Sequence, residues 1–143
     1  MDAAFKVHTK LGPGLLESVY EAALAKEMRK LGHTVERQKP IPVFYDGEIL
    51  EEVGFRADLI VDSMVLVELK SVSQVSDLFK KTTWNYLRLL PLQLGFLMNF
   101  NEVHLKDGIT RIVNGPRENH ISDDKLMSRE GSEGPRLFNY TSP

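Results

Sequence analysis

The sequence contains no cysteine. A disulfide framework, a thiolate zinc site and a cysteine nucleophile are therefore excluded. This absence fits a reducing compartment, so we expect a cytoplasmic protein. No apolar run approaches the roughly 20 residues that a membrane-spanning helix needs. The first residues also lack the basic and apolar regions of a signal peptide, and we expect no membrane partner.

An excess of positive charge is also missing, because the formal net charge is -2 at pH 7. Proteins that bind duplexes usually carry a basic patch, since much of their affinity comes from displacing counterions from phosphates. A metal-dependent nuclease escapes this expectation, because its acidic site repels phosphate until the metal is bound. Net charge therefore argues neither for nor against a nucleic-acid partner.

What is present is the composition of an ordinary globular domain, with 143 residues, 42% of them hydrophobic and 27% charged. A chain of this length buries a proper core. We expect residues 1–116 to form one domain. Apolar residues become scattered after Asn114-Gly115-Pro116, so we interpret residues 117–143 as a C-terminal tail that is mobile or appended.

Turn residues and apolar spacing predict the order of the elements. Asp46-Gly47 and Asp107-Gly108 are typical of hairpin turns, and Pro40 indicates an edge strand or a bend. The central strands are apolar on both faces, so we expect an α/β fold with a sheet covered on both sides. The predicted helices are 3–10, 15–31 and a third that begins after Ser73 or Ser76 and runs to about residue 90. The predicted strands are 35–39, 41–45, 48–52, 55–61, 65–72, 94–100, 103–106 and 109–113.

The most informative segment is the pair of strands around a turn centred near Ser63. Alternation places Glu68 and Lys70 on one face of the second strand, and hairpin pairing places Asp58 beside Glu68 on that same face. Charged groups on such apolar strands are costly to bury without a partner. Two carboxylates are hard oxygen ligands that suit Mg²⁺, and the ammonium of Lys70 can orient a water or stabilise charge on a phosphoryl group.

A second interpretation of these residues is structural. Asp58 can pair with Arg56 or Lys70, and Glu68 with Lys70 can be an ordinary ion pair, which contributes little to stability when exposed. The apolar neighbours favour the metal-assisted interpretation, because central strands do not tolerate unpaired charge.

The segment from Gly14 to Tyr20 opens the predicted second helix. Glu17 and Tyr20 are three residues apart and share a helix face. Glu17 is explained equally well as an acid stabilised by the helix dipole, and Tyr20 as a core aromatic. If the helix covers the end of the sheet that carries Asp58, Glu17 becomes a third acid on the metal side, acting through water.

These residues carry a resemblance to a known family. Gly14, Glu17 and Tyr20 match the signature of the GxxExxY proteins, and the stretch from Asp58 to Lys70 resembles the core of the PD-(D/E)XK nuclease superfamily. The resemblance extends over roughly residues 1–116. It includes Ile41-Pro42-Val43, Tyr45-Asp46-Gly47, Asn85-Tyr86-Leu87 and Met98-Asn99-Phe100.

The resemblance implies a restriction-endonuclease-like αβββαβ core in which Asp58 and Glu68 hold Mg²⁺ or Mn²⁺. Lys70 would be catalytic, with Glu17 assisting. Relatives usually carry a glutamine four residues before the tyrosine that matches Tyr86. Thr82 stands there in this chain, and its hydroxyl is shorter and offers fewer donors than an amide. We therefore expect Tyr20, Thr82 and Tyr86 either to line the site or to serve packing alone.

Basic side chains on the third predicted helix are candidates for contact with a phosphate backbone, although most such charges simply face solvent. These residues are Lys80, Lys81 and Arg88. Our first hypothesis is a metal-dependent nuclease that hydrolyses phosphodiester bonds of DNA or RNA. The alternative is a catalytically weak or inactive module of the same fold that binds nucleic acid or a protein partner. A subunit completed by a homodimer or another protein is a third possibility.

Overall fold

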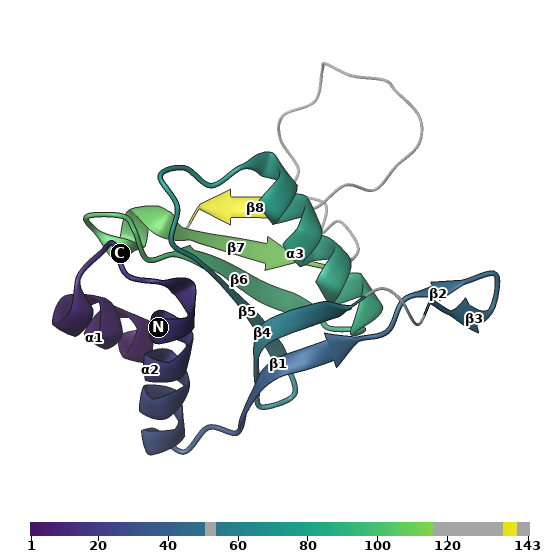
Figure 1. The fold of residues 1–143 in the computed structure, drawn as a ribbon, viewed down its shortest axis with the longest axis horizontal. Coiled ribbons are helices and arrows are strands. Elements are labelled where there is room, and N and C mark those ends of the chain that lie inside the picture. Colours follow the sequence, from purple (N-terminus) through teal and green to yellow (C-terminus); the bar gives the residue numbers. More distant parts are fainter. Residues whose placement is uncertain (51–53, 116–135, 140–143) are drawn as a thin grey trace, which may run out of the picture.

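The computed structural model describes residues 1–50 and 54–115, together with the backbone of 136–139. The chain begins with two helices and continues into strands (Figure 1). The elements are α1 (Asp2–Leu11), α2 (Glu17–Lys30), β1 (Val35–Ile41), β2 (Phe44–Tyr45), β3 (Glu48–Ile49), β4 (Phe55–Val61), β5 (Val65–Lys70), α3 (Asp77–Leu89), β6 (Leu94–Asn99), a 3-10 helix η1 (Leu105–Gly108), β7 (Ile109–Val113) and β8 (Arg136–Asn139).

One mixed sheet forms the centre of the molecule, with its strands in the order β1-β4-β5-β6-β7-β8. β5 and β6 run parallel and are connected through α3, whereas the other neighbours are antiparallel. This arrangement confirms the expected α/β class with a mixed central sheet flanked by helices. The order of elements from α2 to β6 also matches the αβββαβ core, apart from the small β2–β3 hairpin.

The sheet is covered on both faces, as the apolar central strands predicted. The first core lies between the sheet and the two N-terminal helices and includes Tyr20, Leu24, Leu59, Val67 and Phe100. The second core lies between the sheet and α3 and is made mainly of Ile41, Ala57, Ile60, Leu66, Leu87, Leu97 and Ile112. Alternating residues of β5 therefore enter different cores, and the burial of each large side chain stabilises the fold by about 2 kcal/mol.

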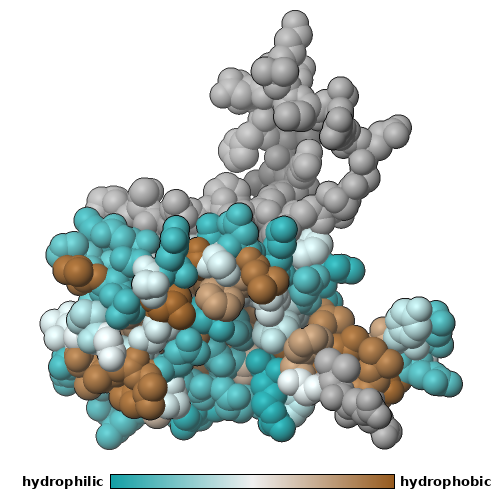
Figure 2. Space-filling view, turned by 45° about the horizontal axis from the view of Figure 1, so that its top comes forward, coloured by the Kyte–Doolittle hydropathy of each residue, from teal (hydrophilic) through white to brown (hydrophobic). Residues whose placement is uncertain are grey.

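The first predicted hairpin turn is confirmed. Asp46 and Gly47 both have positive φ, 50° and 79°, as a two-residue type I′ turn requires. They join β2 to β3, which form a separate two-stranded sheet. Phe44 and Ile49 are paired across it and are 61% and 53% exposed. Figure 2 shows hydrophobic surface at this end of the molecule.

The edge-strand prediction is also confirmed, since Pro40 lies in β1 at the edge of the sheet. A proline has no N–H for the ladder, so an edge is where a strand tolerates it. The strand continues to Ile41 instead of breaking at the proline. Residues 51 and 52 of the predicted strand 48–52 lie outside the described residues.

The predicted hairpin around Asp107-Gly108 is wrong. Residues 105–108 form the 3-10 helix η1, and β7 pairs with β6 instead. Leu105 is only 2% exposed because it packs into the first core. A Cβ on Gly108 would lie 2.5 Å from the carbonyl oxygen of Asn99, so the glycine serves a close approach of two backbone segments.

Of the two caps that the sequence offered for α3, Ser73 and Ser76, the structure uses Ser76. The Ser76 side chain accepts a hydrogen bond from the Phe79 amide at 3.3 Å, and the helix ends just before Pro91. Thr83 and Leu87 form its buried face.

Part of the predicted tail is described. Residues 136–139 form β8, which pairs antiparallel with β7 at the edge of the sheet. The rest of segment 117–143 lies outside the described residues, so the division at residue 116 stays a prediction. In the part of the chain that is described, no helix is long and apolar enough to cross a membrane.

Candidate active site

The register of the β4–β5 hairpin brings the two central acids together. Leu59 pairs with Val67, and the ladder ends there. One step further, Asp58 and Glu68 replace the missing ladder bonds with bonds from their side chains. The Asp58 amide donates to Glu68 Oε1 at 3.0 Å, and the Leu69 amide donates to Asp58 Oδ2 at 2.8 Å. The predicted neighbourhood of Asp58 and Glu68 is therefore present.

β4 also separates from its other neighbour at this position. The ladder between β1 and β4 skips Gln38 and Asp58, and Gln38 has a φ of 51°. Leu59 packs into the first core and Ala57 into the second, although residues two apart share a face in a regular strand. The strand thus changes face at Asp58, which turns this carboxylate toward α2. The prediction that Asp58 shares one face with Glu68 and Lys70 is therefore wrong, because it assumed a regular strand.

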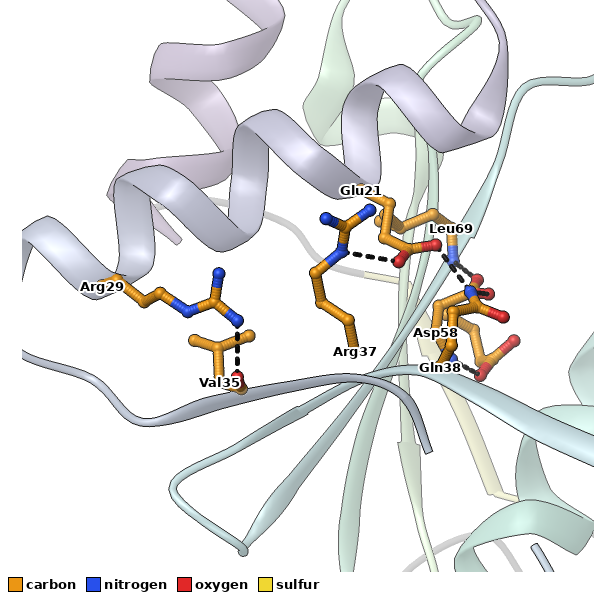
Figure 3. Close-up of polar contacts among 8 residues, drawn as sticks. Glu21, Arg29, Val35, Arg37, Gln38, Asp58 and Leu69 are labelled. Atoms are coloured by element: carbon orange, nitrogen blue, oxygen red, sulfur yellow. Dashed lines mark hydrogen bonds and ion pairs between the residues drawn. The ribbon is translucent and has the colours of Figure 1, made fainter. Parts of the chain in front are cut away.

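A pocket of about 480 Å³ opens between the start of α2 and the sheet at this break. Three carboxylates, Glu17, Glu21 and Asp58, face it from two elements. The close-up shows Glu21 of α2 directed toward Gln38 and Asp58 on the strands below (Figure 3). The pocket is lined by Leu15, Leu16, Glu17, Ser18, Glu21, Gln38, Asp58 and Ser71.

Glu21 and Gln38 contact the site through their side chains but were not among the candidates from the sequence, which included only Glu17 and Asp58 of the pocket residues. Glu21 is 6% exposed, and its carboxylate accepts hydrogen bonds from Arg37 Nε at 2.9 Å and from Gln38 Nε2 at 2.7 Å. Gln38 Nε2 also lies 3.3 Å from Asp58 Oδ1. The spacing of four residues from Glu17 could have identified Glu21, because it lies on the same helix face. No local signal marked Gln38.

The surroundings of Asp58 and Glu68 favour the binding of a proton or a cation by these two carboxylates. Burial, followed by the negative charge of Asp58, raises the pKa of Glu68 to about 8. Burial also raises the pKa of Asp58, and Glu21 adds to this effect. Both carboxylates are thus costly to keep charged without a compensating positive group.

Lys70 supplies part of that compensation. Alternation puts its side chain on the face of Glu68, toward α3, and its Nζ lies 4.4 Å from the centre of the Phe79 ring. Its positive charge works against burial by lowering the pKa values of Asp58 and Glu68. Lys70 is therefore held close to both acids while remaining partly accessible.

Tyr86 of α3 lies within the electric field of the same acids. Its pKa is raised by burial first, and then by the negative charges of Glu68 and Asp58. The Tyr86 ring also contacts Phe55, with ring centres 5.7 Å apart. Thr82, one turn earlier on α3, is half-buried.

Glu17 and Tyr20 have different surroundings although they share a helix. Glu17 lines the pocket, where its Oε1 accepts a hydrogen bond from the Ser71 amide at 3.3 Å. Tyr20 is fully buried and stacks on Phe100, with ring centres 4.6 Å apart. Its hydroxyl donates to the Gly12 carbonyl oxygen and accepts from the Leu15 amide. Tyr20 therefore holds the loop before α2 in place and does not line the pocket.

The three candidate basic residues lie on α3. Lys80 Nζ is 3.7 Å from Asp77 Oδ1. The Arg88 guanidinium lies 4.9 Å from the centre of the Trp84 ring. Lys81 is exposed.

The donor set at the centre of the site fits a divalent cation in its chemistry. Asp58 and Glu68 present adjacent hard oxygen atoms, and the pKa values of both carboxyl groups are raised. A bound cation would stabilise their charged forms. Among the described residues, however, no group of three or more acids or histidines is placed to hold a metal ion. Glu17 is thus not gathered with Asp58 and Glu68 into such a group.

A comparison with protein families decides the classification. The sequence profile described as the PD-(D/E)XK nuclease superfamily matches residues 1–112, which include both helices of the first core and all the site residues above. The chain belongs to the PD-(D/E)XK nuclease superfamily. Membership of the GxxExxY group stays a prediction, because the matched profile describes the superfamily. No curated protein and no solved structure matches the chain.

Nucleases of the PD-(D/E)XK superfamily generally depend on a divalent metal. Within the matched segment, Asp58 lies on β4, Glu68 lies on β5, and Lys70 is the last residue of β5. The acids and the lysine thus come from neighbouring strands of one hairpin. The superfamily supports a nuclease-like function for the domain.

Proposed function

We propose that this protein hydrolyses phosphodiester bonds of a nucleic acid, DNA or RNA, with the help of a divalent metal ion. The observation that supports this most strongly is the pair of hydrogen bonds at the end of the β4–β5 ladder, in which Glu68 accepts from the Asp58 amide and Asp58 accepts from the Leu69 amide. Asp58 is half-buried and Glu68 is buried. Two adjacent carboxylates with raised pKa values, in a chain of this superfamily, are the ligands expected for such an ion.

Asp58 and Glu68 would hold Mg²⁺ or Mn²⁺, and Glu17 would assist through water from the pocket wall. The bound ion would neutralise negative charge that develops on the phosphoryl oxygens and make a nearby water more acidic. Asp58 and Glu68 keep their positions through bonds to backbone amides, so little reorganisation is needed when the substrate arrives.

Lys70 would orient the attacking water or stabilise charge on the phosphoryl group. Its Nζ is held over the Phe79 ring at 4.4 Å, which limits the conformations of a long side chain. Tyr86, close enough to the acids for their charges to raise its pKa, is the better candidate for a site-lining residue on α3. Thr82 would then serve packing.

Lys80, Lys81 and Arg88 are the candidate contacts to the nucleic-acid backbone. Lys81 and Arg88 are exposed, whereas Lys80 lies near Asp77. Charge reversal of Lys81 and Arg88 should weaken nucleic-acid binding in a salt-dependent way. Unchanged binding would contradict this part of the proposal. We keep the cytoplasmic location as a proposal that rests on the lack of cysteine.

The alternative function is a non-catalytic module that binds nucleic acid or a protein partner, including a second copy of the chain. One observation favours it: the oxygens of Asp58 already accept bonds from Leu69 and Gln38. Thr82, in place of the usual glutamine, also favours the non-catalytic alternative. This alternative predicts little or no metal binding by the two acids.

Calorimetric titration with Mg²⁺ and Mn²⁺ tests the proposal. The wild-type protein should bind metal, and the Asp58→Ala/Glu68→Ala double variant should not. A Glu36→Ala variant is the matched control, because Glu36 is an exposed acid on β1 that pairs with Lys39. Equal metal binding by the wild type and the double variant would contradict the proposed ligands.

A further inference from the structure

A chain of polar contacts ends on Asp58 and is not used by the mechanism above. Arg37 Nε donates to Glu21 Oε1 at 2.9 Å, and Gln38 Nε2 donates to Glu21 Oε2 at 2.7 Å (Figure 3). The same Gln38 nitrogen reaches Asp58 Oδ1 at 3.3 Å. The amide of Gln38 is thus shared between a buried acid on α2 and the central aspartate.

The chemistry of the partners fixes the orientation of this amide. Glu21 and Asp58 are carboxylates, and ionised carboxylates only accept hydrogen bonds. The NH₂ group of Gln38 has two hydrogens and can satisfy both acids at once. The reverse orientation would direct the amide oxygen at two negative groups. Arg37 binds Glu21 Oε1, which fixes the Glu21 carboxylate on α2. Glu21 Oε2 in turn holds the amide of Gln38.

The backbone at Gln38 adopts a conformation that its residue type disfavours. Its φ is 51°, in the left-handed region that glycine, asparagine and aspartate adopt more readily. Val35 packs into the first core and Ile41 into the second, although six residues apart they would share a face in a regular strand. The unusual conformation at Gln38 is what allows β1 to change face beside Asp58. Such local strain is often found at functional sites.

We propose that Gln38, anchored by Glu21, is a positioning residue that fixes the carboxylate of Asp58 in the orientation needed to bind the metal. The metal part of this statement rests on the proposed function. The positioning of Asp58 itself does not, because it concerns contacts within the protein.

The amide of Leu69 reports on this positioning without any metal or substrate. It donates to Asp58 Oδ2 at 2.8 Å, so the hydrogen exchange of this amide should depend on how firmly the Asp58 carboxylate is held. The amide of Ile112 on β7 serves as the reference, because the side chain of this residue is fully buried in the second core. Faster exchange at Leu69 alone would indicate a local change and not general unfolding.

Two substitutions remove the amide contact without forcing a new backbone conformation. Gln38→Gly accepts a positive φ and has no side chain, and Gln38→Asn tolerates the same φ but is one methylene too short to reach both acids. Asp46→Gly is the matched control. Asp46 has a φ of 50°, close to that of Gln38. The control therefore places glycine at an equivalent backbone conformation in the β2–β3 turn, away from the pocket.

The experiment compares the wild-type protein with these three variants by hydrogen exchange in a chelator and by Mn²⁺ titration. For Gln38→Gly we expect exchange of the Leu69 amide to accelerate about tenfold, as expected for loss of a hydrogen bond to a charged group. Mn²⁺ affinity should fall about tenfold or more, as is typical when a partner of a metal ligand is removed. Gln38→Asn should show the same changes, and Asp46→Gly neither of them.

The outcomes separate this proposal from the proposed function. Wild-type exchange at Leu69 and wild-type Mn²⁺ affinity in Gln38→Gly would overturn the positioning role and leave the nuclease proposal intact. Faster exchange at Leu69, in a protein whose wild type binds no Mn²⁺, would support the positioning role and overturn the proposed metal site. Equal acceleration at Leu69 and Ile112 would reveal general destabilisation and overturn the positioning role.

Discussion

Glu68 illustrates at the scale of a single residue how its surroundings change a carboxyl group. Its side chain is buried beside Asp58, and its pKa is raised to about 8 against an ordinary value of 4.5. Without a cation, Glu68 therefore keeps its proton at neutral pH. The same burial that makes the group a poor free anion makes it a good ligand for a positive ion.

This shift predicts a pH dependence of stability. Between the pKa of the unfolded chain, near 4.5, and the folded value of about 8, the folded state binds more protons than the unfolded state. The free energy of unfolding therefore falls as pH rises through this window, by a few kcal/mol at most, and levels off above it. Asp58 adds to the fall, because its pKa is also raised.

Urea unfolding in a chelator at pH 5.5, 7.0 and 8.5 measures this effect. Glu68→Gln should lose most of the pH dependence, because its side chain does not titrate. Groups with lowered pKa values, such as Glu27 and Asp62, are already ionised throughout the window. A wild-type protein whose stability rises from pH 5.5 to 8.5 relative to Glu68→Gln would contradict the raised pKa.

Tyr20 is a second case in which one residue has a definite structural task. Tyr20→Phe keeps the ring that stacks on Phe100 but removes the hydroxyl that bonds Gly12 and Leu15. We expect a loss of about 1–3 kcal/mol in the free energy of unfolding, measured with urea, because two backbone groups lose their partner. Tyr45→Phe is the control, since Tyr45 is 68% exposed. Equal effects of the two substitutions would show that the buried hydroxyl has no special role.

At the scale of elements, the sequence predicted best those that depend on local chemistry. The Asp46-Gly47 turn, the Ser76 cap and the strands of the β4–β5 hairpin follow from turn residues, capping and alternation. The segment around Asp107-Gly108 offered the same local signal and did not form a hairpin. Leu105 is drawn into the first core, so tertiary packing outweighed the turn propensity.

Gly108 tests how closely this segment packs against the end of β6. A Cβ at this position would lie 2.5 Å from the Asn99 carbonyl oxygen, whereas Gly54 has nothing within 4 Å of the same position. Gly108→Ala should therefore lower the free energy of unfolding by roughly 1–3 kcal/mol through overpacking. Gly54→Ala should be near neutral, and thermal unfolding of the two variants measures the difference. A neutral Gly108→Ala would mean that the backbone approach is not tight.

At the scale of the whole molecule, the sheet with helices on both faces was predictable because its central strands are apolar throughout. The juxtaposition of Asp58 with Glu68 was predictable too, since it follows from the register of one tight hairpin. The pocket was only partly predictable. Gln38 enters it through an unusual φ, and Glu21 through the packing of α2 on the sheet, and neither depends on local sequence alone.

The most direct test of the central claim is cleavage of labelled single- and double-stranded DNA and RNA by the purified protein. With Mg²⁺ or Mn²⁺ we expect cleavage that a chelator abolishes, and a rate reduced about a hundredfold or more in Asp58→Asn and in Lys70→Ala. Lys26→Ala, an exposed lysine on α2, should cleave like the wild type. Cleavage by Asp58→Asn at the wild-type rate, or full activity in the chelator, would contradict the proposed mechanism.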